Sequence, residues 1–270
     1  MSKQAALAIV AHPDDVEFTM AGTLLLLKDK GFDIHFWNLA NGSYGSMVHP
    51  LADIIRIRAE EGAAGAKLAG ATYHPAITDD LAILYRPEFI AKITAVVRAV
   101  KPSIIFTHSP QDYMEDHMNA ARLTVTGTFI RAAPNYVSDP PVPAWAGDTV
   151  VYHAVPHGLK GPLRETVHSE IYVDIATTLA RKGAALAAHK SQQEWLEATQ
   201  GMGSMVGEME EFSAGVGALS GRFAHAEGFR RHLHFGFADE AFDPLSDALG
   251  DKAWRDPDYG KTASLLRGLK

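Results

Sequence analysis

Two clusters of acidic and histidine side chains in this chain have residue types and spacings suited to chemistry. In the first, His12, Asp14 and Asp15 follow an apolar run that predicts a buried strand over 7–11. Adjacent carboxylates repel each other and resist removal from water, so they are expected beside a cation or where one of them acts as a base. The second cluster, Asp-Tyr-Met-Glu-Asp-His over 112–117, follows a predicted strand at 104–107. Two strands that each end in acids and a histidine predict a site for one metal ion.

Three of these side chains form a plausible ligand set. His12 and Asp15 lie three residues apart in a turn that Pro13 stiffens, so both can reach one ion, and His117 would complete the set. Three protein ligands leave zinc an open position for water, which is the arrangement of a catalytic site. The same donors suit Fe²⁺ or another divalent ion. The alternative is that His12 merely ends a strand and the two aspartates cap the next helix.

Asp14 is the carboxylate left over from this set. It adjoins a ligand but would point elsewhere, close enough to accept a proton from a metal-activated water, as a general base does. Alternatively, Asp14 caps the following helix or orients a histidine.

Composition narrows the remaining classes of function. The chain has 270 residues, a formal net charge of −7 and no cluster of Lys and Arg, which argues against a nucleic-acid partner. It has no cysteine, so any metal must be held by nitrogen and oxygen donors. No cationic segment leads into an apolar one at the N-terminus, and no apolar stretch approaches the roughly 20 residues of a membrane span. We therefore expect a cytoplasmic protein.

The elements that must position these residues alternate along the chain. Strands are predicted at 7–11, 32–39 and 104–107, with a short one within 73–77, and helices at 21–30, 52–68, 87–100 and 116–131. This alternation is typical of an α/β fold with a doubly wound parallel sheet and helices on both faces. In its commonest strand order the first and fourth strands are neighbours, and a crevice opens at their carboxyl ends. His12, Asp15 and His117 would then share that crevice.

The second half of the chain is less regular. It suggests a loop at 133–148, strands at 149–153 and 171–174, and a helix at 175–190. Residues 202–222 are rich in Gly and Met without a convincing period, which suggests a flexible loop near the site or a contact in a homo-oligomer. We expect one domain over 1–238 and a peripheral tail over 239–270.

The first motif, Ala11-His-Pro-Asp-Asp15-x-Glu17, together with the distant Asp116-His117, resembles the PIG-L/LmbE-like zinc de-N-acetylases. That family deacetylates N-acetylglucosaminyl conjugates such as GlcNAc-phosphatidylinositol and the precursors of mycothiol and bacillithiol. Weaker matches extend the resemblance over roughly residues 5–237, at Arg58-x-x-Glu61, Tyr172-Val-Asp174, Lys182-x-x-Ala185, His189-x-x-Gln192 and Ala226-Glu-Gly-Phe229. The resemblance implies a Rossmann-like fold, zinc on His12, Asp15 and His117, and Asp14 as the general base.

The chain departs from the family pattern at Met114, where members often have a histidine that polarises the carbonyl or protonates the amine. A thioether cannot donate a proton. His108, His189 and His225 are candidate replacements, and the Tyr113 hydroxyl could donate to an oxyanion. We choose His225, because the alternation in His-Ala-Glu-Gly-Phe suits a strand or turn closing over the crevice. Substrate contacts are expected from Arg58, Tyr113 and His189.

The resemblance implies a hydrolase that removes the N-acetyl group from an N-acetylglucosamine-type sugar or conjugate, a small-molecule substrate. The alternatives are a hydrolase that uses the same site on another amide or ester, and a catalytically weak sugar- or metal-binding module, for which Met114 is the best support. The strand at 7–11 is not followed by G-x-G-x-x-G, which argues against NAD or FAD.

Overall fold

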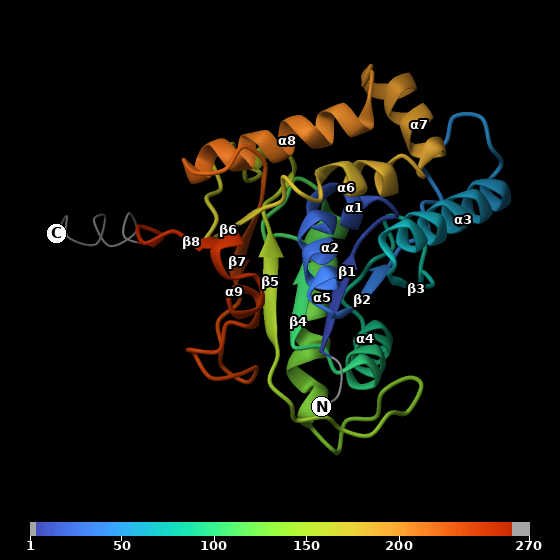
Figure 1. Ribbon diagram of the computed structural model, residues 1–270. Coiled ribbons are helices and arrows are strands. Elements are labelled where there is room, and N and C mark those ends of the chain that lie inside the picture. Colours follow the sequence, from blue (N-terminus) through green and yellow to red (C-terminus); the bar gives the residue numbers. More distant parts are fainter. Residues whose placement is uncertain (1–3, 261–270) are drawn as a thin grey trace.

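The computed structural model describes residues 4–260, in which helices cover both faces of an eight-stranded sheet (Figure 1). The strand order is β3-β2-β1-β4-β5-β7-β6-β8. The first five strands in this order run parallel, and β7, β6 and β8 are antiparallel to their neighbours. The predicted Rossmann-like α/β fold with a mostly parallel sheet is confirmed. The strands are β1 Ala5–Val10, β2 Asp33–Asn38, β3 Thr72–His74, β4 Ile104–Thr107, β5 Val150–Ala154, β6 Ile171–Asp174, β7 Ala226–Arg231 and β8 Ala253–Arg255.

Strand β1 lies at the centre of the parallel part, and all six of its residues are buried. A strand covered on both faces has to be apolar at every position, which explains the unbroken run in the sequence. β1 pairs in parallel with β2 and with β4, in the register Ala6↔Ile104 and Ala8↔Phe106. The first and fourth strands are therefore neighbours, as predicted, and their carboxyl ends meet at one edge of the sheet.

Two groups of helices enclose the sheet. Helices α2, α3 and α9 pack with one face of β1, through Ala6 and Val10, whereas α4 and α5 pack with Leu7 and Ile9 on the other. Helices α6, α7 and α8 lie across the carboxyl end of the parallel strands (Figure 1). The helices are α1 Asp15–Thr19, α2 Ala21–Asp29, α3 Leu51–Ala69, α4 Pro87–Val100, α5 Glu115–Phe129, α6 Leu179–Leu186, α7 Lys190–Gln200, α8 Met205–Ser220 and α9 Pro244–Leu249.

The Gly- and Met-rich segment 202–222 is not a flexible loop, because most of it is the regular helix α8, and its role in a homo-oligomer contact stays a prediction. The Ser204 hydroxyl caps the helix by accepting from Gly207 N–H. Its buried face repeats at helical spacing through Met205, Met209, Phe212 and Val216. Glycines elsewhere in the helix interrupt the apolar pattern in the sequence. Close packing requires glycine at position 217, because a Cβ there would lie 2.5 Å from the Phe223 carbonyl oxygen.

The segment after 238 contributes to the fold. Helix α9 adds the fully buried Leu245 to the core, and β8 pairs with β6. The Tyr152 hydroxyl also donates to Asp243 at 2.7 Å. Residues 261–270 lie outside the described part, and the division into a domain over 1–238 and a tail stays a prediction. Between residues 4 and 260, no helix has the length and apolar character needed to cross a membrane.

Candidate metal centre

The first motif forms a sharp turn where β1 ends. Asp14 adopts a left-handed backbone conformation, with φ 106° and ψ −25°, which is rare for a residue other than glycine. The Asp15 carboxylate folds back and accepts from His12 N–H at 2.6 Å. Such backbone strain costs about 1–3 kcal/mol and persists mainly at functional sites. The turn sends Asp14 and Asp15 in different directions, which allows them different roles.

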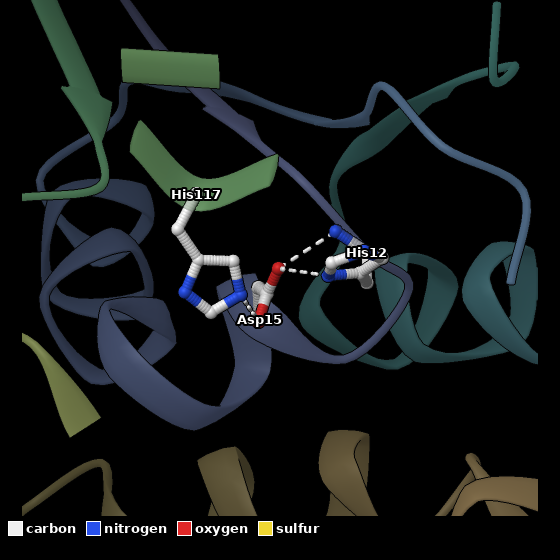
Figure 2. Close-up of side chains that lie close together, drawn as sticks. All are labelled: His12, Asp15 and His117. Atoms are coloured by element: carbon white, nitrogen blue, oxygen red, sulfur yellow. Dashed lines mark hydrogen bonds and ion pairs between the residues drawn. The ribbon is translucent and has the colours of Figure 1, made fainter. Parts of the chain in front are cut away.

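His12, Asp15 and His117 converge as predicted (Figure 2). Each offers one ligand atom, and these atoms all lie within 4.8 Å of one another. His12 Nδ1 and His117 Nε2 each lie 3.6 Å from an oxygen of Asp15. Donors about 2.0–2.1 Å from a shared zinc ion lie on the order of 3–3.5 Å apart, so small shifts would bring these atoms to one ion.

Two further carboxylates orient the histidine rings. Asp116 Oδ2 lies 3.0 Å from His12 Nε2, and Asp112 Oδ1 lies 3.0 Å from His117 Nδ1. In each ring the other nitrogen therefore faces Asp15. Metal-binding histidines commonly hydrogen-bond to a carboxylate in this way. Sequence reasoning missed these roles, although both aspartates lie in the 112–117 cluster.

The same carboxylates prepare the site for positive charge. Burial alone would lower the pKa of His12, but its contacts with Asp116 and Asp15 raise it to about 10. The surroundings of His12 thus stabilise a cation at this position. A metal ion would take the place of the proton on the ring nitrogen that faces Asp15.

A second group of possible donors shares one residue with the first. His108, Asp112 and His117 also bring ligand atoms within 4.8 Å. The rings of His108 and His117 stack, with centroids 4.0 Å apart. His108 Nε2 accepts from Ala11 N–H at 2.9 Å, and Asp112 is bonded to His117. Both groups could hold an ion, and His12, Asp15 and His117 are the set that the sequence predicts.

Asp14 lies beside this centre and lines the cavity next to it, with 9% of its surface exposed. Burial raises the pKa of Asp14 to about 6, although the nearby Arg58 guanidinium lowers it. Arg58 Nη2 lies 3.8 Å from Asp14 Oδ1 and donates to the Pro13 carbonyl at 2.7 Å. The site therefore contains a carboxylate outside the ligand set whose pKa is close to neutral, as a general base requires.

The cavity at the carboxyl edge of the sheet has a volume of about 390 Å³. Of the predicted substrate contacts, Arg58 and Tyr113 line it, and Met114 lies among the lining residues. Its aromatic lining consists of Phe18, Tyr44, Tyr113, His157 and Trp195, besides the site histidines. Helices α7 and α8 and their connection contribute apolar side chains, namely Leu196, Met202 and Met205.

Two predicted residues are not brought to the cavity. His189 is completely buried, with Nε2 3.3 Å from Glu17 Oε1, so it cannot contact a substrate as expected. His225 precedes β7, its carbonyl accepts from Ile175 N–H, and it is absent from the lining residues, which corrects its choice as the acid. His108 and His157 are the lining histidines outside the ligand set. From the sequence, His157 beside Pro156 could line the crevice but is more readily interpreted as part of a surface loop, and the fold brings it to the cavity.

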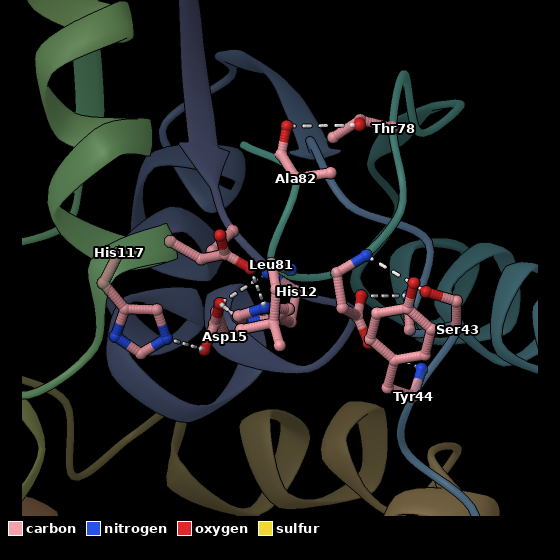
Figure 3. Close-up of polar contacts among 12 residues, drawn as sticks. His12, Asp15, Ser43, Tyr44, Thr78, Leu81, Ala82 and His117 are labelled. Atoms are coloured by element: carbon pink, nitrogen blue, oxygen red, sulfur yellow. Dashed lines mark hydrogen bonds and ion pairs between the residues drawn. The ribbon is translucent and has the colours of Figure 1, made fainter. Parts of the chain in front are cut away.

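The loop that carries Tyr44 is fixed to the metal centre through the segment 78–82 (Figure 3). The Asp80 carboxylate accepts from Gly42 N–H at 2.7 Å and from Tyr44 N–H at 3.0 Å. The next residue, Leu81, donates its N–H to Asp116 at 2.6 Å. Asp80 thus holds the loop that carries Tyr44, and the adjacent Leu81 holds Asp116, the carboxylate that contacts His12.

Comparison with known proteins agrees with this geometry. Residues 7–127, which include all three candidate ligands, match the model of the family PIG-L, described as GlcNAc-PI de-N-acetylase. The diacetylchitobiose deacetylase of Thermococcus kodakarensis is 26% identical over 193 residues, which cover 69% of each chain.

Solved structures share the fold. The N,N'-diacetylchitobiose deacetylase of Pyrococcus horikoshii superposes with a TM-score of 0.71 at 21% identity, covering 90% of this chain and 89% of that one. GalB of Pseudomonas putida, the 4-carboxy-2-hydroxymuconate hydratase, has a TM-score of 0.72 at 22% identity, covering 85% and 96%. Proteins with this fold thus include deacetylases and a hydratase.

Proposed function

The chain belongs to the PIG-L/LmbE-like deacetylase family, and from this we propose that it is a metal-dependent hydrolase that removes the N-acetyl group from an N-acetylglucosamine-type sugar or conjugate. The observation that carries the proposal is the position of Asp14. It is a largely buried carboxylate that lies beside the ligand set without joining it, in a strained backbone conformation. A site that only binds has no need for such a carboxylate, which argues against a binding module.

The residues present fit a divalent ion, and zinc is our first choice with Fe²⁺ as the alternative. Two imidazoles and one carboxylate in a cysteine-free chain are the donors that catalytic zinc takes, with a position left open. When bound, the ion would polarise the acetyl carbonyl and make a water molecule acidic enough to lose its proton near pH 7.

Asp14 would perform the proton transfers. It takes a proton from the attacking water, whose oxygen forms a bond to the acetyl carbon. It then returns that proton to the sugar nitrogen as the C–N bond breaks, releasing acetate and the amine. A pKa of about 6 allows both steps. We assign both to Asp14 because of its position beside the ligand set; Met114 carries no proton to give, and His225 lies outside the lining residues.

The second function found among proteins of this fold, hydration, fits the cavity less well. The name 4-carboxy-2-hydroxymuconate denotes a substrate with several carboxylates. Among the residues that line this cavity, Arg58 is the one Lys or Arg side chain, and it lies next to Asp14. A bound metal and Arg58 would leave the remaining carboxylates of such a substrate without a cationic partner, which costs free energy.

Acetate release tests the proposal. The zinc-loaded protein is incubated with N-acetylglucosamine, N,N'-diacetylchitobiose and an O-acetyl ester of glucose, before and after removal of the metal by a chelator. We expect acetate from the N-acetyl sugars and its loss on chelation, with recovery when zinc or Fe²⁺ is added back. Release from the ester alone would favour the other hydrolase, and no release from any probe would overturn the proposal.

A further inference from the structure

We infer that the substrate is an uncharged amphiphile, an amino sugar whose acetamide lies at the metal centre while an apolar substituent lies against Trp195, Leu196 and Met202. This inference rests on the proposed deacetylase function and specifies its substrate class. It follows from three properties of the cavity, namely its charge, its apolar wall and its size.

The charge of the lining disfavours an anionic substrate. The lining carboxylates are those of Asp14, Asp15, Asp80 and Asp112, against the single guanidinium of Arg58. That guanidinium already lies beside Asp14 and donates to Pro13. Proteins bind phosphates and carboxylates with Arg forks, Lys or free amide N–H groups. Besides a bound metal, the lining therefore offers an anionic group one Arg side chain, which is buried and already lies beside Asp14, and no Lys.

The apolar wall comes from α7, the start of α8 and their connection. Met205 is buried against Leu186 and Met209, and the half-buried Leu196 and Met202 pack on the same cluster. These side chains are thus held by the core on one side and face the cavity on the other. Trp195 adds an aromatic surface, which contacts both sugar rings and apolar chains well. Thioethers adapt to varied apolar shapes.

The metal centre and the apolar wall line one cavity of about 390 Å³. Cavities that enclose drug-sized ligands have volumes of roughly 300–1,000 Å³. An acetylated monosaccharide is smaller than a drug-sized molecule, so it leaves part of this space unfilled. Helices α7 and α8 lie across the carboxyl end of the strands, where the ligand set is formed (Figure 1). In the inferred binding mode the acetamide lies at Asp14 and the substituent extends toward the apolar wall, since both regions line the same cavity.

Three probes test the inference with the metal-loaded protein. They are N-acetylglucosamine, its octyl glycoside and N-acetylglucosamine 1-phosphate, which differ in the anomeric substituent. We expect kcat/KM for acetate release to be at least about tenfold higher for the octyl glycoside than for the free sugar, since even one methylene in an apolar pocket is worth about tenfold or more. The phosphate should be the poorest of the three. Equal values, or preference for the phosphate, would overturn the inference.

Variants locate the effect. Trp195→Ala and Leu196→Ala should each lower the ratio of kcat/KM for the octyl glycoside to that for the free sugar by about threefold or more. Leu163→Ala is the matched control, because Leu163 is 88% exposed and outside the lining, and it should leave the ratio unchanged. An unchanged ratio in both wall variants would overturn the assignment of the wall.

Calorimetric binding separates this inference from the proposed function. If none of the probes releases acetate, the deacetylase proposal fails. Even then, the inferred apolar wall would be supported if the octyl glycoside bound more tightly than the free sugar and if Trp195→Ala weakened that binding. Equal binding of the two would contradict it.

Discussion

Asp116 Oδ2 lies 3.0 Å from Nε2 of His12, a residue 104 positions earlier in the chain. The same oxygen accepts from Leu81 N–H, which fixes the carboxylate from a third direction. His12 is therefore held with Nδ1 toward Asp15 by contacts within the protein. Because the His12 ring is already oriented, binding of a metal ion would cost less conformational entropy.

Asp116→Ala should weaken metal binding about 10–100-fold, the usual effect of removing a carboxylate that orients a metal-binding histidine. Asp112→Ala should act similarly through His117. Competition with a chromophoric chelator measures the affinity. Asp139, an exposed partner of Lys92, provides the control Asp139→Ala. Wild-type affinity in both site variants would show that the aspartates do not orient ligands.

His117→Ala should strongly reduce the metal content of the purified protein, because it removes one of three protein donors. Elemental analysis after dialysis gives the stoichiometry, and circular dichroism checks that the fold is kept. His157→Ala, in a residue that lines the cavity outside the ligand set, should retain the metal. If His117→Ala bound metal at wild-type stoichiometry, the assigned ligand set would be wrong.

Asp14→Asn should keep the metal and lose on the order of 10²–10⁴-fold in kcat, the usual contribution of a general base. An amide is close in size to the carboxylate but cannot take up the proton. Acetate release and metal content are measured on the same preparation. Loss of metal in Asp14→Asn, with retention in Asp15→Asn, would require the two roles to be exchanged.

Lys182→Met should destabilise the protein by about 3–5 kcal/mol, because it leaves Glu227 buried without its cation. Both side chains are fully buried, 2.7 Å apart, and Glu227 also accepts from the N–H groups of Gly22 and Thr23 at the start of α2. Urea denaturation measures the loss. The double variant Lys182→Met/Glu227→Gln should recover part of it.

The neighbouring residue provides the control for this pair. Arg181 forms an exposed ion pair with Asp29, so Arg181→Met should cost about 1 kcal/mol or less. If Lys182→Met and Arg181→Met lowered the free energy of unfolding equally, burial of the Lys182–Glu227 pair would not be the cause of the loss.

Stability should fall as the pH drops from about 6.5 toward 4, in part because of His153. Burial lowers the pKa of His153 to about 4, whereas an unfolded histidine has a pKa of about 6.5. In this window the unfolded chain binds a proton that the folded one does not, which favours unfolding by up to roughly 3 kcal/mol. Urea denaturation at pH 7 and pH 5 measures the difference.

The variant His153→Asn keeps a donor for the His108 carbonyl, which Nδ1 of His153 contacts at 2.7 Å, but does not titrate. It should lower stability at pH 7 yet reduce the difference between pH 7 and pH 5 by about 2 kcal/mol. His49→Asn, in an exposed residue, should leave that difference unchanged. A wild-type pH dependence in His153→Asn would exclude this histidine as the cause.

The parallel half of the fold could be predicted because its signals are local. A central strand such as β1 must be apolar throughout, and the residues just after it lie at the carboxyl edge by topology alone. The sequence alone was therefore enough to predict that His12, Asp15 and His117 lie close together. The parts that could not be predicted depend on contacts between distant segments. Glycines that allow close packing concealed the period of α8, and β8 joins the sheet only through its pairing with β6.

Individual roles at the site were harder to predict than its location. From the sequence, His189 could contact a substrate like any other histidine near the site. Only the structure shows that it is fully buried and contacts Glu17 instead. Met114 and the second cluster predicted a missing proton donor, but the sequence could not show that His225 lies away from the cavity. Side-chain direction decides such roles, and direction depends on the packing of the whole domain.

The ligands, the carboxylates that orient them and Asp14 all lie between residues 12 and 117, whereas the apolar wall is built from residues 195–205. The stretch that matches the family model, 7–127, contains the former and ends before the latter. The proposed chemistry and the proposed apolar wall thus draw on separate stretches of the chain. Exchanging the stretch around α7 and the start of α8 between relatives would then alter the apolar wall while the proposed ligands and Asp14 stay in place.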